Sequence, residues 1–434
     1  MKRLIVDYTH CESLANVQAQ LLRNTVNYVY QHSSYYKKRF DSINIDIHSI
    51  KSMDDLLMLP IITKLELLEH NEDFFCCRIP EAADIVTTSG STGLNPIIHP
   101  LTYGDLCRLS YNEKLSFEIS NIDKNDHVLL TTALDGSFVA GLAYYLGLKE
   151  IGTSVIRAGS KNMFMQADVI NRYNITAIVG VPSNLIKLYR YMQNNHYDGA
   201  NQITKLVLIG ESIRNRDFTL NQLGIRLSKC FPYARLYSTY ANTETCTSFC
   251  ECSAGKGGHL LPNLAFVEIV DDGGFRVKDG ELGRVIITTF GAQGMPLLRY
   301  DTGDISFLNS EKCECGRISQ RLGPIISRAH NISKIGGITF SQAQLENVIL
   351  SCAMVEDYCI IVQTDEDNIQ SVKIYVTSYD HNTKELISLI KQKVWNFVRI
   401  SVEVEYSSWE DLKKKQNSNN TRKPLRFIYE NTVK

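Results

Sequence analysis

Short runs of β-branched and aliphatic residues alternate with helix-like stretches between about residues 84 and 212. The runs are ADIVTTSGSTG, DHVLLTTA, GTSVIRAG, ITAIVGVPS and KLVLIGES, and each ends in small or polar residues. Helix-like stretches such as MFMQADVINRY and SNLIKLYRYMQNN separate them. This alternation predicts a largely parallel sheet covered by helices. Ligands gather at the carboxyl ends of the strands in such sheets, where these polar loops lie.

The pattern changes on both sides of this region. Residues 1–80 are helical and polar in character, with two short helices separated at Pro60. FVEIVDDGGFRV and GRVIITTF predict a hairpin-like β region, and SQAQLENVILSC, YCIIVQ, SVKIYVTS, KELISLIKQKVWNFV and SVEVEY predict a compact α+β unit. We expect an α/β fold with a large N-terminal domain, residues 1–327, that combines mostly parallel, helix-covered sheets with a β-rich subdomain. A small α+β domain, residues 328–434, follows it.

Composition narrows the functional classes. The chain has 434 residues, 44% of them hydrophobic and 21% charged, which is typical of a soluble globular protein of more than one domain. A formal net charge of -1 gives no reason to expect nucleic acid or an anionic membrane as a partner. The start, MKRLIVDYTHCESL, has too short an apolar stretch for a secretory signal, and we expect a cytoplasmic protein. Its twelve cysteines are then thiols or metal ligands.

The segment TTSGSTGLNP, residues 87–96, combines glycines with hydroxyl side chains and no acidic residue. Clustered backbone amides and hydroxyls suit a phosphate or another oxyanion, although a plain loop has the same composition. A Walker A motif requires Gly-Lys five and six places after its first glycine, where Asn95 and Pro96 stand here. The segment is therefore not a P-loop.

A second pattern indicates a metal. CECSAGKGGH and CECG place Cys252, His259, Cys313 and Cys315 at C-x6-H and C-x-C spacing, with Cys250 as a substitute ligand. Three thiolates and an imidazole suit a closed tetrahedral Zn²⁺ site. The alternative is four unrelated reduced residues. We expect a structural zinc that fastens the β-rich region to the loop before the small domain.

Five segments, taken in order, resemble the adenylate-forming ligases: TTSGSTGLNP, YSTYANTETC, GELGRVIITTF with MPLLRYDTGD, ISRAHNISKIGGITFSQAQLE, and TRKPLRF. Within that superfamily the chain is similar to the phenylacetate–coenzyme A ligase branch, over about residues 30 to 430. The resemblance implies an ATP-dependent ligase. It would convert a small organic acid, aryl or otherwise, into an acyl-adenylate with release of pyrophosphate, and then transfer the acyl group to a thiol, coenzyme A. It also implies Mg²⁺ and a mobile small domain that turns about residues 328–331.

The resemblance also implies roles for individual residues. Lys423 would bridge the carboxylate and the α-phosphate, Glu244 would hold Mg²⁺, Thr243 would lie beside the α-phosphate, and Arg328 would face the adenylate. Asp304 would bind the ribose hydroxyls. The remaining nucleotide-binding candidates are Thr88, Ser89, Gly90, Ser91, Thr92, Gly93, Gly210, Glu211, Ser212 and Tyr240, and those of the acid pocket are Asp135, Phe138, Gly141 and Tyr144.

Four alternatives stay open. Asp135 resembles the aspartate that pairs with the α-ammonium group in amino-acid-activating relatives. The hinge departs from the family pattern, with Ser327 in place of glycine and His330 and Asn331 in place of carboxylates. Transfer to the phosphopantetheine arm of a carrier protein is therefore a rival to free coenzyme A. A non-catalytic nucleotide-binding scaffold is the rival from another class, and a homodimer is an open alternative for assembly.

Overall fold

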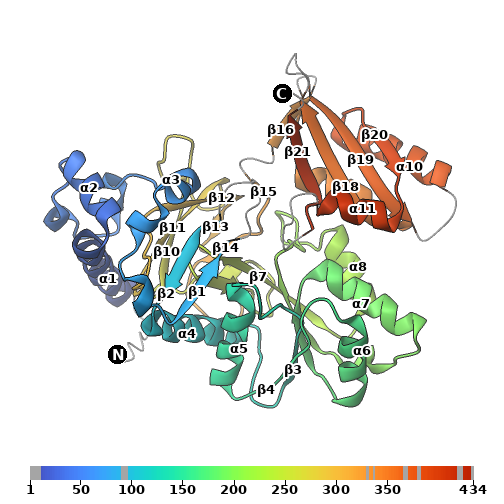
Figure 1. Ribbon diagram of the computed structural model, residues 1–434, viewed down its shortest axis with the longest axis horizontal. Coiled ribbons are helices and arrows are strands. Elements are labelled where there is room, and N and C mark those ends of the chain that lie inside the picture. Colours follow the sequence, from blue (N-terminus) through green and yellow to red (C-terminus); the bar gives the residue numbers. More distant parts are fainter. Residues whose placement is uncertain are drawn as a thin grey trace. The chain divides into compact units, whose positions relative to one another are not determined.

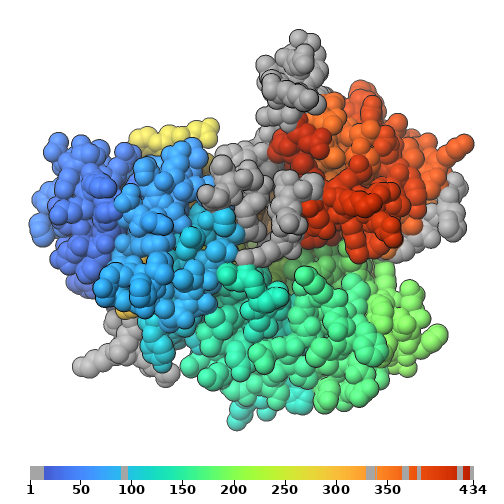
Figure 2. Space-filling view, viewed as in Figure 1, coloured from blue at the N-terminus to red at the C-terminus, as the bar shows by residue number. Residues whose placement is uncertain are grey.

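The computed structural model describes residues 11–88, 96–328, 332–335, 338–364, 370–378, 383–417 and 424–431. The chain divides into two compact units. The larger contains Pro96–Leu220, Gly224–Ile325 and the chain before them up to Thr88, and the smaller contains Asn221–Leu223 and the chain from Ile326 onward. Figure 1 shows the helices and strands of each unit, and Figure 2 shows one face of the molecule with all atoms drawn.

The larger unit begins with a layer of helices. These are α1 (Cys11–His32), α2 (Ser34–Ser42), α3 (Lys64–Glu69) and the short 3-10 helices η1 (Ile47–Ser49), η2 (Asp54–Met58), η3 (Asn71–Phe74) and η4 (Ile79–Glu81). The two short helices predicted around Pro60 are η2 and α3. Thr63 caps α3, because its side chain accepts from Glu66 N while the Glu66 carboxylate accepts from Thr63 N. Just before this cap, Ile62 N donates to Arg299 O, which fixes α3 against the β-rich region.

A six-stranded sheet forms the centre of the larger unit, in the order β4-β3-β5-β6-β7-β8. Its strands are β3 (His127–Leu130), β4 (Ser154–Arg157), β5 (Ala177–Gly180), β6 (Lys205–Ile209), β7 (Arg235–Asn242) and β8 (Thr247–Cys250), and its helices are α4 (Tyr103–Ile119), α5 (Val139–Ile151), α6 (Met163–Arg172), α7 (Pro182–Asn194) and α8 (Gln222–Cys230). The 3-10 helix η5 (Gly199–Gln202) precedes β6. All neighbours pair in parallel except β7 and β8. The predicted helix-covered parallel sheet is confirmed, with α4 and α5 packed on one face (Figure 1).

The β-rich part of the larger unit consists of antiparallel pairs. Its strands are β1 (Asp84–Thr87), β2 (Ile98–Leu101), β9 (Gly258–His259), β10 (Ala265–Val270), β11 (Gly283–Thr289), β12 (Tyr300–Ser306), β13 (Leu308–Asn309) and β14 (Arg321–Leu322). β10, β11 and β12 form the predicted hairpin-like region. One face of this sheet packs on the N-terminal helices through residues such as Phe74 and Tyr300. The sheet therefore links the first helices to the central part of the unit.

The smaller unit is a four-stranded sheet with helices on both faces. Its elements are β15 (Ser327–Arg328), β16 (Ile332–Ile335), β17 (Ile338–Ser341), α9 (Gln342–Leu350), β18 (Val355–Thr364), β19 (Gln370–Ser378), α10 (Thr383–Val398), β20 (Glu403–Tyr406), α11 (Trp409–Gln416) and β21 (Phe427–Asn431). The sheet order is β20-β19-β18-β21. Ile360 and Val362 pack with α9 and α10, whereas the alternating Cys359 and Ile361 pack with Leu412 of α11. The sequence prediction included α9, β18, β19, α10 and β20, and it did not include β15, β16, β17, α11 or β21.

Among the described residues, the helices are all too short or too polar to cross a membrane.

Candidate active site

Two neighbouring strands of the central sheet end in the residues predicted to meet the nucleotide. β6 ends at Ile209, and Gly210 follows with a φ of 76° that glycine adopts without strain. β7 ends at Asn242, and Thr243 and Glu244 follow. Because β6 and β7 are parallel, both sets of residues lie at the same edge of the sheet. This edge is where open α/β sheets bind ligands.

Glu211 and Ser212 come next, and their side chains are engaged within the protein. The Glu211 carboxylate accepts from Ser183 N at 2.9 Å and from Ser183 Oγ at 2.8 Å, at the start of α7. Ser212 Oγ donates to Arg214 O at 3.3 Å. At this segment the backbone, with Gly210, is therefore the part best suited to face a ligand.

Tyr240 and Asp304 join the central sheet to the sheet that contains β12. Tyr240 lies on β7 and donates from its hydroxyl to Asp304 Oδ2, 2.9 Å away on β12. Burial, and then the charge of Asp304, holds the pKa of Tyr240 well above its usual range, so its hydroxyl stays protonated. The hydrogen bond orients a carboxylate that is only 5% exposed. This brings two sequence-predicted residues together from positions far apart in the chain.

Glu244 meets a cation that the sequence analysis did not single out. Lys64, the first residue of α3, places its Nζ 3.3 Å from Glu244 Oε1. The Glu244 side chain is 8% exposed and that of Lys64 is 41% exposed. A buried carboxylate is costly without a partner, and Lys64 supplies one from the solvent side. No local pattern could have revealed the pair, because the antiparallel sheet and the capped helix create it.

A cavity lies beside these strand ends, between the sheet and helices α4 and α5. Its lining consists of Leu109, Glu113, Phe138, Val139, Ala140, Ala143, Tyr144, Ile209, Gly210, Ala241, Asn242, Thr243, Cys246 and Thr247. Most of these side chains are apolar, with a few polar groups among them, as is usual for a pocket that binds a small organic molecule.

Two of the four residues predicted for the acid pocket line the cavity, and two do not. Phe138 and Tyr144 line the cavity. Gly141 is not among its lining residues, and a Cβ there would collide with the backbone oxygen of Ala133, so this glycine serves the close packing of α5. Asp135 is exposed and is likewise not among the lining residues. The buried carboxyl group in the lining belongs to Glu113 of α4 instead.

Several predicted residues cannot be placed. Ser89, Gly90, Ser91, Thr92, Gly93 and Lys423 lie outside the described residues, as does the proposed pivot at Asn331. Thr88 is described: its backbone N donates to Ile97 O at 3.0 Å, and its Oγ1 accepts from Ile97 N at 3.1 Å. Thr88 thus anchors one end of the glycine-rich segment to the β1–β2 hairpin. Arg328 lies on β15 and is exposed.

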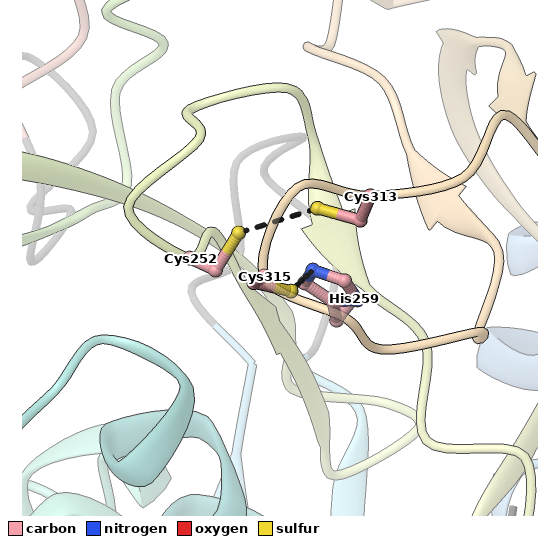
Figure 3. Close-up of side chains that lie close together, drawn as sticks. All are labelled: Cys252, His259, Cys313 and Cys315. Carbon is pink, nitrogen blue, oxygen red and sulfur yellow. Dashed lines mark hydrogen bonds between the residues drawn. The ribbon is translucent and has the colours of Figure 1, made fainter.

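The four predicted zinc ligands converge (Figure 3). Cys252 follows β8, His259 lies on β9, and Cys313 and Cys315 lie between β13 and β14. Their ligand atoms are all within 4.8 Å of one another. Cys252 Sγ is 3.5 Å from Cys313 Sγ, and Cys315 Sγ is 3.4 Å from His259 Nε2. These separations fit a tetrahedral zinc site, in which Zn–S bonds of about 2.3 Å place neighbouring ligand atoms about 3.8 Å apart.

The surroundings of the cluster support metal binding. His259 Nδ1 lies 3.0 Å from Ser319 Oγ, a contact that leaves Nε2 directed at the sulfur atoms. Burial, with Arg317 and Arg321 nearby, lowers the pKa of His259 to about 4, so the imidazole is neutral, as a ligand must be. Cys250 is not part of the group; its Sγ accepts from Thr239 Oγ1 at 3.1 Å.

The sheet edge, the Tyr240–Asp304 pair and the buried Glu244 are the features expected of an adenylate-forming enzyme. A family model described as AMP-binding enzyme matches residues 65–295, which is more than half of the chain. The chain belongs to the AMP-binding enzyme family. The predicted α/β fold and the predicted resemblance to adenylate-forming ligases are both confirmed.

Individual relatives agree with this assignment. Phenylacetate-coenzyme A ligase of Thermus thermophilus is 25% identical over 373 residues, which cover 84% of this chain and 81% of that protein. Among solved structures, a 2-hydroxyisobutyryl-CoA ligase in the postadenylation state has a TM-score of 0.82 at 15% identity and covers 96% of this chain and 89% of that one. The same ligase in the thioesterification state, with CoA, has a TM-score of 0.70 at 16% identity and covers 98% of this chain and 91% of that one.

Proposed function

We propose that the chain activates a small carboxylic acid with ATP and transfers the acyl group to coenzyme A. The observation that carries this proposal is the cavity that adjoins Gly210 and Thr243 at the strand ends, because it offers a place for an acid beside the predicted nucleotide residues. The coenzyme A ligases among the relatives support the acceptor. Asp304 would accept from the ribose hydroxyls, and Thr243 would lie beside the α-phosphate.

Activation brings one anion to another, so positive charge must be held where the acid meets the α-phosphate. Glu244 fits the role of a Mg²⁺ ligand, because Mg²⁺ in nucleotide sites binds through one or two carboxylates together with the phosphates. Bound there, Mg²⁺ would neutralise phosphate charge. Lys423 and Arg328 would supply further cations from the smaller unit, whose movement between the two half-reactions we also propose. The 2-hydroxyisobutyryl-CoA ligase, solved in postadenylation and thioesterification states, supports that movement.

The direct test is acid-dependent ATP–pyrophosphate exchange over aryl, aliphatic and amino acids, followed by thioester analysis with coenzyme A. We expect exchange with at least one acid and thioester formation with the same acid. Exchange without thioester would favour the carrier-protein alternative, and exchange with α-amino acids alone would favour amino-acid activation. Absence of exchange with every acid would favour the non-catalytic scaffold. A cytoplasmic location, a carrier-protein partner and a homodimer stay predictions.

Lys64 offsets the negative charge of Glu244 when no metal is bound, and we expect its removal to change the melting temperature measurably. Lys64→Met leaves the carboxylate without this cation, and the melting temperature of the ligand-free protein should fall by about 1–2 °C, since Lys64 is partly exposed. Added Mg²⁺–ATP should then stabilise the variant more than the parent, because Mg²⁺ restores the balance. Lys38→Met is the control, because Lys38 pairs with Asp73 and is more exposed than Lys64. Equal stabilisation of variant and parent would contradict this role.

We propose that Cys252, His259, Cys313 and Cys315 hold a structural zinc ion. All four positions are at least partly buried, and Cys252, His259 and Cys313 are fully so. Such a closed donor set leaves no open position for chemistry. The ion would fasten the loop between β13 and β14 to β9 and to the chain after β8.

Cys313→Ser should remove the zinc and lower the melting temperature while leaving most pyrophosphate exchange at ambient temperature, because the metal stabilises the fold without touching the acid. Metal analysis of protein purified without added zinc, together with a thermal scan, measures this. Cys250→Ser is the matched control, since this cysteine is equally buried but bonds to Thr239, and it should retain zinc. A folded parent protein that contains no zinc would disprove the site.

A further inference from the structure

The acid cavity has two different walls. Ile209, Gly210 and Thr243 come from the strand ends and adjoin the residues proposed to hold the nucleotide. Glu113 and Tyr144 come from helices α4 and α5 and form the other wall. Because the acid must present its carboxyl group to the nucleotide, the remainder of the molecule must face the helices.

Glu113 is an unusual residue for that wall. It is 3% exposed, and its partners in the described chain are two uncharged side chains, Asn112 and Ser248. Asn112 Nδ2 is 3.5 Å from Glu113 Oε1 but only 2.7 Å from Ser248 Oγ, so the amide bonds mainly to the serine. Within the part of the chain that the structure describes, no ion pair balances Glu113. A buried carboxyl group with such weak compensation is costly to fold.

Helices α4 and α5 pack closely at Glu113. Gly147 of α5 lies directly against Glu113, since a Cβ at that position would collide with the Cβ and the backbone of Glu113. The close approach of α4 and α5 therefore fixes the backbone and Cβ of Glu113 against α5. Burial raises the pKa of Glu113 to about 7, and in either protonation state the group has an oxygen that accepts a hydrogen bond.

We propose that Glu113 selects carboxylic acids that carry a hydrogen-bond donor, a hydroxyl or an amine, on the part of the molecule remote from the reacting carboxyl group. The inference rests on the proposed function and specifies its substrate class. A donor would add a hydrogen bond to a buried carboxyl group whose protein partners are uncharged, whereas an apolar substituent of equal size would add none. Sites built to bond a substrate hydroxyl reject analogues without it strongly, by factors that can reach about 10⁴.

The test uses acids in matched sets, in which one position carries hydroxyl, amine, methyl or hydrogen. Phenylacetates and benzoates provide two such sets, and an acid with an aliphatic ammonium group separates a cation from a neutral donor. In pyrophosphate exchange, we expect the hydroxyl or amine acid to exceed its methyl counterpart in kcat/KM by about 10²-fold or more in the parent protein. Glu113→Met should reduce that ratio to near unity, mainly by raising exchange with the methyl acid relative to the donor acid.

Glu113→Gln serves as the second variant, because the amide keeps an accepting oxygen and should retain part of the preference. A thermal scan checks that both variants fold. A parent ratio near unity in every set, or an unchanged ratio in both variants, would overturn the assignment while the proposed ligase activity stands. Absence of exchange with every acid would instead overturn the proposed function and this inference with it.

Discussion

Glu244→Gln should lower acid-dependent pyrophosphate exchange by a factor on the order of 10²–10³. The substitution keeps the shape of the side chain but removes the charge proposed to hold Mg²⁺ where the phosphates meet the acid. Because Glu244 is only 6% exposed, water has little access to take the place of the missing carboxylate as a metal ligand. Exchange at saturating ATP, measured over a range of Mg²⁺ concentrations, should show both a lower maximum and a higher Mg²⁺ requirement.

The matched control is Glu118→Gln, a change of the same kind at the exposed end of α4, where the carboxylate pairs with Lys114 at 3.8 Å. It should leave exchange at the level of the parent protein. If Glu244→Gln exchanges as fast as this control at every Mg²⁺ concentration, Glu244 is not the metal ligand, and its pairing with Lys64 is purely structural.

Lys423→Ala should also reduce exchange by a factor on the order of 10²–10³, while ATP still binds. This lysine is proposed to offset the repulsion between the carboxylate and the α-phosphate, so its loss acts on the transition state more than on nucleotide affinity. Pyrophosphate exchange at saturating ATP gives the rate, and a nucleotide-binding titration gives the affinity. The expected signature is a large fall in the rate with a small change in affinity.

Lys414→Ala provides the comparison, because Lys414 is an exposed lysine of α11 that contacts Asp411 at 3.4 Å. It should be indistinguishable from the parent protein. Exchange retained in Lys423→Ala would assign the role to another cation, and Arg422, which directly precedes Lys423 in the sequence, is the one to replace next. Loss of ATP binding would instead show that Lys423 contributes mainly to the affinity for the nucleotide.

The sequence alone determined those features that depend on local order. β-branched runs and the polar residues that end them predict elements through short-range rules, so the parallel sheet, the hairpin region and half of the elements of the smaller unit were predicted correctly. Ordered motifs identified the family, and the spacing of Cys252, His259, Cys313 and Cys315 anticipated a cluster that the structure brings together. The polar stretch that contains α11 was less informative, because that helix is defined by packing Leu412 on the sheet.

Only the tertiary structure decided which residues face one another across elements. Asp135 was predicted for the acid pocket from its place in the sequence, yet it is exposed. The carboxylate residue that lines the cavity is Glu113, on a part of α4 that approaches α5 closely because Gly147 has no side chain. Lys64 meets Glu244 because Ile62 is hydrogen-bonded to the β-rich sheet just ahead of α3. A side chain's partners at long sequence separation depend on helix packing and strand pairing, and no local pattern records them.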